Sequence, residues 1–145
     1  MIQRIINDLL TRQVTIDQSA PRPVTPDDIA VLSPYRWQSL QLQNHLVRLG
    51  LRPDRIGTVD AMQGSSIPIT IYGMTAGHRA EIQEHAEFLF QPNRWNVALS
   101  RSKALSIVVG NIDAHADAQT QTTKGLLHQR RIMALLNDIS STAVA

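Results

Sequence analysis

The sequence predicts an α/β fold in which a parallel sheet is flanked by helices on both faces, giving three layers. Short apolar segments of strand length alternate along the chain with longer segments of helical periodicity, as expected when helices connect parallel strands. The strand segments are continuously apolar instead of alternating apolar and polar residues, which indicates burial on both faces of the sheet. Proline and glycine separate many of these segments and mark the connections between them.

The composition is that of one ordinary globular domain. With 145 residues, of which 43% are hydrophobic, the chain is long enough for a real core. Its formal net charge of +2 permits nucleic-acid binding without arguing for it. The absence of cysteine excludes disulfides, thiolate metal sites and cysteine nucleophiles, and it suits a cytoplasmic location. Because no run of ~18 apolar residues occurs, we expect no membrane association.

In the N-terminal third, apolar spacing predicts a helix over residues 1–12, and a loop punctuated by prolines follows it. Residues 28–33 form an apolar run of strand length. Ser33 and the proline after it predict a helix start, with a capping hydroxyl and then proline at the first helical position. We expect this helix to end at Gly50 and to place Trp37 in the core.

The rest of the chain continues the alternation of strands and helices. We expect strands at 55–59, 67–74 and 105–109, a helical turn at 81–87, and helices at 93–103 and 123–139. Pro68 indicates that the second of these strands begins at an irregular edge, because proline cannot donate a backbone hydrogen bond.

Polar clusters follow three of the predicted strands, and in parallel sheets binding sites form at the carboxyl ends of strands. The most informative cluster, TVDAMQGSS, brings Thr58, Asp60, Gln63 and Gly64 into one turn. The Thr58 hydroxyl can donate to a phosphate oxygen, Gln63 can orient a water or a phosphate, and Gly64 allows close approach of the backbone to a ligand. Local chemistry alone favours a simpler alternative, a turn closed by a hydrogen bond from Asp60.

The stretch NRWNVALSRSK places Arg94 and Arg101 on one helix face, because seven residues at ~100° each make nearly two turns. A guanidinium can bind phosphate through two hydrogen bonds and can stabilise the charge on a transferring γ-phosphoryl group. For each arginine, an ion pair between helices or simple solvation remains the alternative. We expect Lys103 to be a surface charge at the end of this helix.

The cluster SPYRWQ offers a second kind of contact. The Ser33 hydroxyl could meet a nucleic-acid phosphate, and Tyr35 could either stack on a base or pack in the core. The five histidines lack metal-ligand spacing. The chain also lacks a G-x-x-x-x-G-K-[ST] phosphate loop and a pair of acids for Mg²⁺ after a strand.

In order, IAVLSPYRWQ (29–38), IGTVDAMQGSS (56–66) and NRWNVALSRSK (93–103) resemble motifs IV, V and VI of superfamily 1 DNA/RNA helicases. The resemblance spans 28–111 and is to the second, C-terminal RecA-like domain of the Upf/Dna2-like branch, including bacterial members fused to RecB-like nucleases. It implies a RecA-like fold of the P-loop NTPase type over residues 1–145, as one domain of a larger protein.

The resemblance implies ATP hydrolysis with Mg²⁺, both held mainly by a first RecA-like lobe that would be the partner of this chain. Arg101 would be the arginine finger, Gln63 and Gly64 would couple the nucleotide to the strand, and Arg94 would be an accessory to motif VI. Thr58 would touch the backbone of single-stranded DNA or RNA, Ser33 would lie near that groove, and Tyr35 and Asp60 are further candidates for strand contact. The chain alone is expected to be inactive as an ATPase.

Two other functions remain open. The chain could be a non-catalytic nucleic-acid or protein-binding module derived from a helicase, which is favoured by Ser66 where the family usually has a glutamate that contacts the nucleotide sugar. It could also be a small α/β enzyme that uses its strand ends to bind an unrelated nucleotide.

Overall fold

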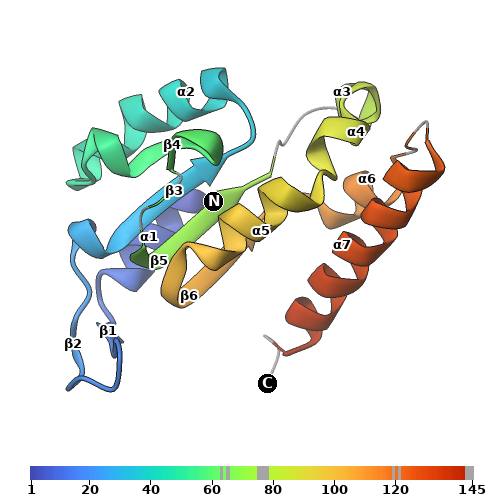
Figure 1. Cartoon of the computed structure of the whole chain (residues 1–145). Coiled ribbons are helices and arrows are strands. Elements are labelled where there is room, and N and C mark those ends of the chain that lie inside the picture. Colours follow the sequence, from blue (N-terminus) through green and yellow to red (C-terminus); the bar gives the residue numbers. More distant parts are fainter. Residues whose placement is uncertain (63, 65, 75–78, 119, 121, 143–145) are drawn as a thin grey trace. The chain divides into compact units, whose positions relative to one another are not determined.

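The computed structural model describes residues 1–62, 64, 66–74, 79–118, 120 and 122–142. The chain divides into two compact units (Figure 1), which are described separately. The first unit consists of Met1–Thr75 and Val97–Val109, and the second of Ala76–Asn96 and Gly110–Ala145.

The first unit is built on a four-stranded parallel sheet of order β4-β3-β5-β6. The strands are β3 (Ile29–Ser33), β4 (Ile56–Thr58), β5 (Ile67–Gly73) and β6 (Ser102–Val109). The predicted α/β fold with a parallel sheet flanked by helices is therefore confirmed. The stretch expected to be a loop also contains a two-stranded antiparallel ribbon, β1 (Gln13–Val14) with β2 (Arg22–Pro23).

One face of the sheet carries the main apolar core. Neighbouring strands align their branched side chains in rows there, for example Val31 beside Ile56 and Ile71. Helix α1 (Ile2–Leu9) contributes Ile6 to this core, and helix α2 (Arg36–Leu46) contributes Leu46. Each such buried aliphatic side chain stabilises the fold by roughly 1.5–3 kcal/mol, so this core holds the strand ends in place.

The other face of the sheet meets the C-terminal end of helix α5 (Pro92–Ser100). Ser106 of β6 points to this face, and its hydroxyl donates to the carbonyl oxygen of Leu99 at 3.1 Å. The connection from β5 to β6 moves across the sheet in the direction opposite to that from β3 to β4. Right-handed crossovers therefore place α2 and α5 on opposite faces.

The start of α2 differs from the prediction. Its N-cap residue is Tyr35, so Ser33 does not cap the helix as expected. The end agrees with the prediction, because a 3₁₀ turn follows the helix and stops at Gly50, which has a φ of 88°. Trp37 was expected in the core but is 53% exposed. The reason is helix geometry, because the buried face is set by Ser39, and a residue two positions earlier lies about 200° around the helix.

Pro68 was expected to mark an irregular edge, and this prediction is only partly right. The register of β5 against β6 does shift between Ile67 and Ile69, so the strand begins with a bulge. However, β5 lies between β3 and β6 in the interior of the sheet. The bulge lets proline occur there, because a bulged residue need not donate to the ladder.

The second unit is helical. It contains α3 (Arg79–Glu84), α4 (Ala86–Leu89), α6 (Ile112–Ala116) and α7 (Thr123–Thr142). Residues 81–87 and 123–139 were expected to be helical and largely are, whereas α6 was not expected. Among the described residues, we find no helix with both the length and the apolar character needed to cross a membrane.

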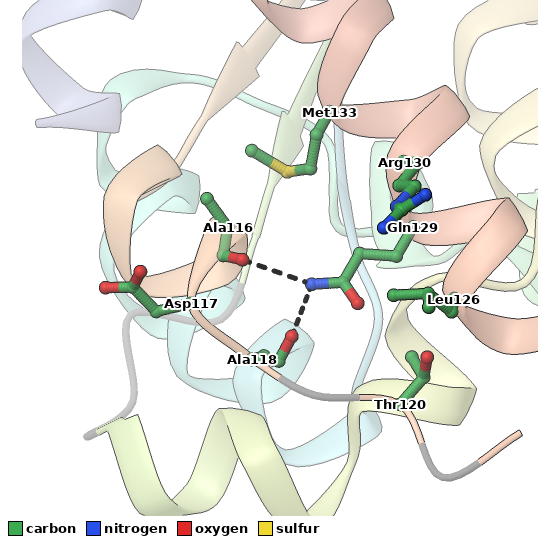
Figure 2. A pocket seen from close by; sticks show the side chains of 8 residues that line it. All are labelled: Ala116, Asp117, Ala118, Thr120, Leu126, Gln129, Arg130 and Met133. Carbon is green, nitrogen blue, oxygen red and sulfur yellow. Dashed lines mark hydrogen bonds between the residues drawn. The ribbon is translucent and has the colours of Figure 1, made fainter.

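Two buried polar side chains fix the connection from α6 to α7. The Gln129 amide nitrogen donates to the carbonyl oxygens of Ala116 and Ala118 (Figure 2) and also to that of His115 at 3.1 Å. The Nδ1 of His115 donates to the carbonyl oxygen of Asn111 at 2.7 Å. Burial lowers the pKa of His115, so the imidazole is neutral at neutral pH and has a structural place in this core.

Candidate functional site

The carboxyl ends of β3 and β4 bring together two residues that the sequence singled out. Ser33 and Thr58 are partners in the parallel register, so they lie side by side at this edge. The Ser33 side chain is fully buried, and its hydroxyl donates to the Tyr35 carbonyl oxygen at 2.9 Å and lies 2.7 Å from Ser39 Oγ. The Ser33 hydroxyl therefore organises the start of α2, and the half-buried Thr58 is the more accessible of the two.

The turn after β4 begins with a 3₁₀ helix, Asp60–Met62. The Thr58 hydroxyl oxygen accepts a hydrogen bond from the backbone N–H of Ala61 at 3.3 Å, so a threonine closes this turn locally. Asp60 is exposed, and Met62 is buried.

Gly64 has a φ of +85°, in the region that favours glycine, and an added Cβ would meet no heavy atom within 4 Å. The positive φ explains why glycine stands at position 64, and the approach of a ligand to its backbone stays a prediction. Gln63, the other residue predicted to contact the nucleotide from this turn, lies outside the described residues.

Arg101 lies between the end of α5 and the start of β6 and is half-buried. Its Nε donates to the carbonyl oxygen of Val97 at 3.3 Å. Its own carbonyl oxygen accepts the backbone N–H of Ile67 at 2.9 Å, which joins Arg101 to the end of the turn that carries Gly64. In the part of the chain that the structure describes, no carboxylate forms an ion pair with Arg101, so its terminal guanidinium nitrogens can bind an anion.

The candidate residues of the first unit therefore lie at the two opposite ends of the parallel strands. Ser33 and Thr58 end their strands, whereas Arg101 lies beside the first residues of β5 and β6. In the sequence, the segment that carries Gly64 connects the carboxyl end of β4 to the amino end of β5. The sequence singled out Arg101 but did not place it relative to the strands, because its position depends on pairing between Ile67 and Ser102 that is not local.

A cluster of hydroxyl groups supports the end of α5, and the sequence analysis did not identify it. Ser102 Oγ lies 2.5 Å from Ser106 Oγ, and both oxygens lie within hydrogen-bond distance of the Leu99 carbonyl oxygen, at 3.2 and 3.1 Å. Because each hydroxyl has one proton, one of them donates to Leu99 and the other donates to its neighbouring serine. Thr70 Oγ1 lies 3.3 Å from Ser106 Oγ and extends the cluster to β5. These bonds satisfy a helix-terminal carbonyl and fix the backbone on both sides of Arg101. Two serines four residues apart at the start of the strand after the helix were the available signal.

The other predicted residues have local partners. In the second unit, Arg94 Nε donates to Gln91 Oε1 at 3.2 Å, and its guanidinium carbon lies 4.0 Å from the centre of the Phe88 ring, a cation–π contact. Lys103 was expected at a helix end, but it lies within β6, with its Nζ 3.9 Å from Asp17 Oδ2. The helix ends earlier than predicted, at Ser100, because the chain enters the sheet there.

The aromatic residues of the cluster after β3 form a small stack at the surface. The rings of Tyr35 and Trp37 have centroids 6.4 Å apart and planes 15° apart. Tyr35 is half-buried and covers one face of the more exposed Trp37. Tyr35 is therefore neither fully in the core nor fully exposed, and stacking on a base remains a prediction.

The parallel sheet, its flanking helices and the glycine turn after β4 define the class of protein, an α/β domain of the RecA-like P-loop type. The chain belongs to the AAA domain family, whose match covers residues 1–113.

Similarity to helicases supports this assignment. The chain is 37% identical over 114 residues to an uncharacterised ATP-dependent helicase of Caenorhabditis elegans, a match that covers 78% of this chain and 6% of that protein. It is 34% identical over 91 residues to the human RNA helicase Mov10l1 (61% of this chain, 8% of that protein). It is 33% identical over 94 residues to the Drosophila melanogaster homologue of regulator of nonsense transcripts 1 (61% and 8%). The match thus spans less than a tenth of each of these relatives, and the domain is a helicase-family domain.

Proposed function

We propose that this chain is the C-terminal motor lobe of an ATP-dependent superfamily 1 helicase or translocase, a branch that includes bacterial proteins fused to RecB-like nucleases. The observation that carries the proposal is the placement of Arg101. Its guanidinium follows α5, has no acidic partner among the described residues, and is joined through its backbone to the turn that carries Gly64.

In this proposal a first RecA-like lobe holds ATP and Mg²⁺. Among the described residues there is no group of three potential metal ligands of the His, Cys, Asp and Glu types. Bound ATP supplies the phosphoryl group that is transferred to water. Arg101 acts as the arginine finger by stabilising the negative charge that spreads over the transferring group. Gly64 and Gln63 approach the nucleotide through the turn, and Arg94 assists from the start of α5.

The carboxyl ends of β3 and β4, at the other end of the strands from Arg101, would contact single-stranded DNA or RNA. Thr58 contributes a half-buried hydroxyl at the end of β4, and Asp60 is exposed just after it. Tyr35 presents a ring stacked on Trp37, and Ser33 positions Tyr35 through its hydrogen bond to the Tyr35 carbonyl oxygen. The turn after β4 then links strand binding to the position of Arg101, because it runs from Thr58 to Ile67, whose N–H bonds to Arg101.

The test is to replace Arg101 with alanine in the protein that carries both lobes and to measure ATP turnover and ATP binding separately. We expect turnover to fall by a factor of about 10³–10⁵, with ATP binding retained. Arg94→Ala is the comparison variant, because it removes the same charge from α5, seven residues earlier. Since Arg94 is only an accessory in this proposal, we expect a smaller loss of turnover than in Arg101→Ala. Unchanged turnover in Arg101→Ala would remove Arg101 from the mechanism.

A second measurement concerns the chain by itself. We expect the purified 145-residue chain to have no ATPase activity, because it lacks a phosphate-binding loop. Turnover by the isolated chain would overturn the two-lobe proposal.

A non-catalytic binding module derived from a helicase is the second candidate. One specific observation favours it: Ser66 is exposed at the position where the family usually carries a glutamate for the nucleotide sugar. This candidate predicts strand binding that does not change when a first lobe and ATP are added.

A further inference from the structure

The second unit carries a groove that the proposed motor function does not use. It lies along α7, against the end of α4 and the start of α5, and has a volume of ≈ 560 Å³. Its charged and amide-bearing lining residues are Glu87, Gln91, Asn93, Lys124, His128 and Arg131. We call this feature the α7 groove.

The positive charge of the α7 groove comes from one face of one helix. Lys124, His128 and Arg131 are spaced at i, i+4 and i+7, which places their side chains in a single row along α7. Within the described residues, no carboxylate forms an ion pair with Lys124 or Arg131. Both side chains are exposed, so they can bind an anion from solution.

Glu87 is the acidic residue that lines the groove, and it already has partners. Its Oε1 accepts the backbone N–H and the hydroxyl of Thr122, each at 2.9 Å. The Thr122 Oγ1 in turn accepts the backbone N–H of Gly125 at 3.0 Å, as an N-cap does. The start of α7 is thus closed by side chains of the protein itself, and the anion-binding groups of the groove are the cations on the side of the helix.

Two amide groups add hydrogen-bond donors across the groove from the cations. Gln91 lines the groove and uses its Oε1 to accept from Arg94, so the group it can offer to an anion is its NH₂ donor. Asn93 is exposed at the start of α5. Cations and amides together suit phosphate oxygens, which accept from Lys, Arg, Asn and Gln without regard to base sequence.

The spacing of the cations favours a polymer over a compact anion. Lys124 and Arg131 are seven residues apart, which is about 10 Å along the helix axis. A strand with successive phosphates can meet both side chains, whereas one small anion would meet mainly one of them. We propose that the α7 groove binds the phosphate backbone of single-stranded nucleic acid without base specificity. This inference rests on the proposed function for the identity of the strand. Apart from Asn93, the first residue of motif VI, the groove uses none of the residues assigned to the three motifs.

The test measures fluorescence anisotropy of labelled oligouridylate and oligothymidylate with the full chain over a range of salt concentrations. We expect Lys124→Ala and Arg131→Ala each to weaken binding on the order of fivefold, the scale of one exposed charged contact. Each should also reduce the slope of log affinity against log salt by about 0.7. Arg130→Ala is the matched control, because it removes an exposed arginine from the next position of the same helix, which lines a different pocket. It should change affinity less than about twofold.

The possible outcomes separate this inference from the motor proposal. Equal losses in Arg130→Ala and Arg131→Ala would indicate diffuse charge attraction and would overturn the groove. Unchanged affinity in Lys124→Ala and Arg131→Ala, or no binding by the wild-type chain, would also overturn it, while the ATPase test of Arg101 would still decide the motor proposal. Displacement of the oligonucleotide by an equal concentration of inorganic pyrophosphate would show a compact-anion site instead of a strand site. Similar affinity for both oligonucleotides would mean that the groove does not distinguish RNA from DNA.

Discussion

Replacing Asp28 with asparagine should destabilise the first unit markedly. Asp28 precedes β3 and is only 5% exposed. Its carboxylate accepts two hydrogen bonds from the Arg22 guanidinium, at 2.7 and 2.5 Å. It also accepts the backbone N–H and the hydroxyl of Thr25, both at 2.8 Å. One buried carboxylate therefore joins the ribbon strand β2 to the start of the central sheet.

The size of the effect follows from which bonds asparagine can replace. An amide oxygen in place of Oδ2 can still accept from Thr25 and from Arg22 Nη1. The NH₂ group would then stand in place of Oδ1 and face Arg22 Nη2, and two donors cannot bond to each other. Because Arg22 is 46% exposed, water screens its charge and the ion pair itself contributes modestly. The loss of the bond from Arg22 Nη2 to a buried charged acceptor, together with the two donors left facing each other, dominates the effect. We expect Asp28→Asn to cost about 2 kcal/mol of unfolding free energy.

The pH dependence gives a second check. The hydrogen bonds from Arg22, and then those from Thr25, hold the pKa of Asp28 well below its usual range. A carboxyl with a lowered folded-state pKa contributes stability that is fully present above its unfolded pKa of about 3.9 and is lost as the pH falls below that value. The difference between wild type and Asp28→Asn should therefore shrink between about pH 4 and the acid limit of folding.

Urea unfolding, followed by circular dichroism at neutral and acid pH, measures both effects. Asp54→Asn is the control, because Asp54 also forms an arginine pair, with Arg52, but both side chains are more than half exposed. It should change stability little. A cost of Asp28→Asn below that of Asp54→Asn, or one that does not depend on pH, would refute the reasoning.

Three further substitutions test other parts of the structure. Ser39→Ala removes a buried hydroxyl that bonds to Ser33 Oγ at 2.7 Å, and it should lower the unfolding free energy by about 1–2 kcal/mol in urea titrations; no loss would mean that Ser33 is satisfied without it. Gly125→Ala would place a Cβ 2.6 Å from both carboxylate oxygens of Glu87, so the better helix propensity of alanine should raise stability only in a Glu87→Ala background, by about 0.5–1 kcal/mol. Thermal melts in which the two substitutions have additive effects would contradict this coupling. Gln129→Met keeps the length of the side chain but loses its donor to three carbonyl groups, and it should cost about 2–4 kcal/mol in urea unfolding, whereas a neutral effect would show that water replaces the amide.

The sheet could be predicted from the sequence because its strands are short, continuous and apolar. Runs such as residues 29–33 are buried at every position, and only a strand covered on both faces allows that. The ribbon of β1 and β2 escaped prediction because each of its strands is two residues long, which is too short for any periodicity. The outward position of Trp37 was not predicted either, because the bond between Ser33 and Ser39 fixes the rotation of α2 about its axis. A buried pair of serines leaves no apolar periodicity in the sequence from which that rotation could be predicted.

For the candidate site, the sequence indicated the types of residue but not their arrangement. Thr58 and Ser33 could be placed together because both end strands of one parallel sheet. Arg101 could not be placed, since its neighbours are set by the pairing of β5 with β6, thirty-odd residues apart in the chain. The hydroxyl cluster of Ser102 and Ser106 depends on the same pairing and escaped for the same reason.

The bond from the Ile67 N–H to the Arg101 carbonyl oxygen has a mechanical consequence. A displacement of the turn after β4 that moves Ile67 acts directly on the main chain at Arg101. A link between the two ends of the parallel strands therefore does not require a chain of side-chain contacts. Such a link tolerates almost every amino-acid change at either end. Only proline at position 67 would remove the N–H donor. A chain with that change would keep the Arg101 side chain but would lose the backbone hydrogen bond that joins Arg101 to the end of the turn.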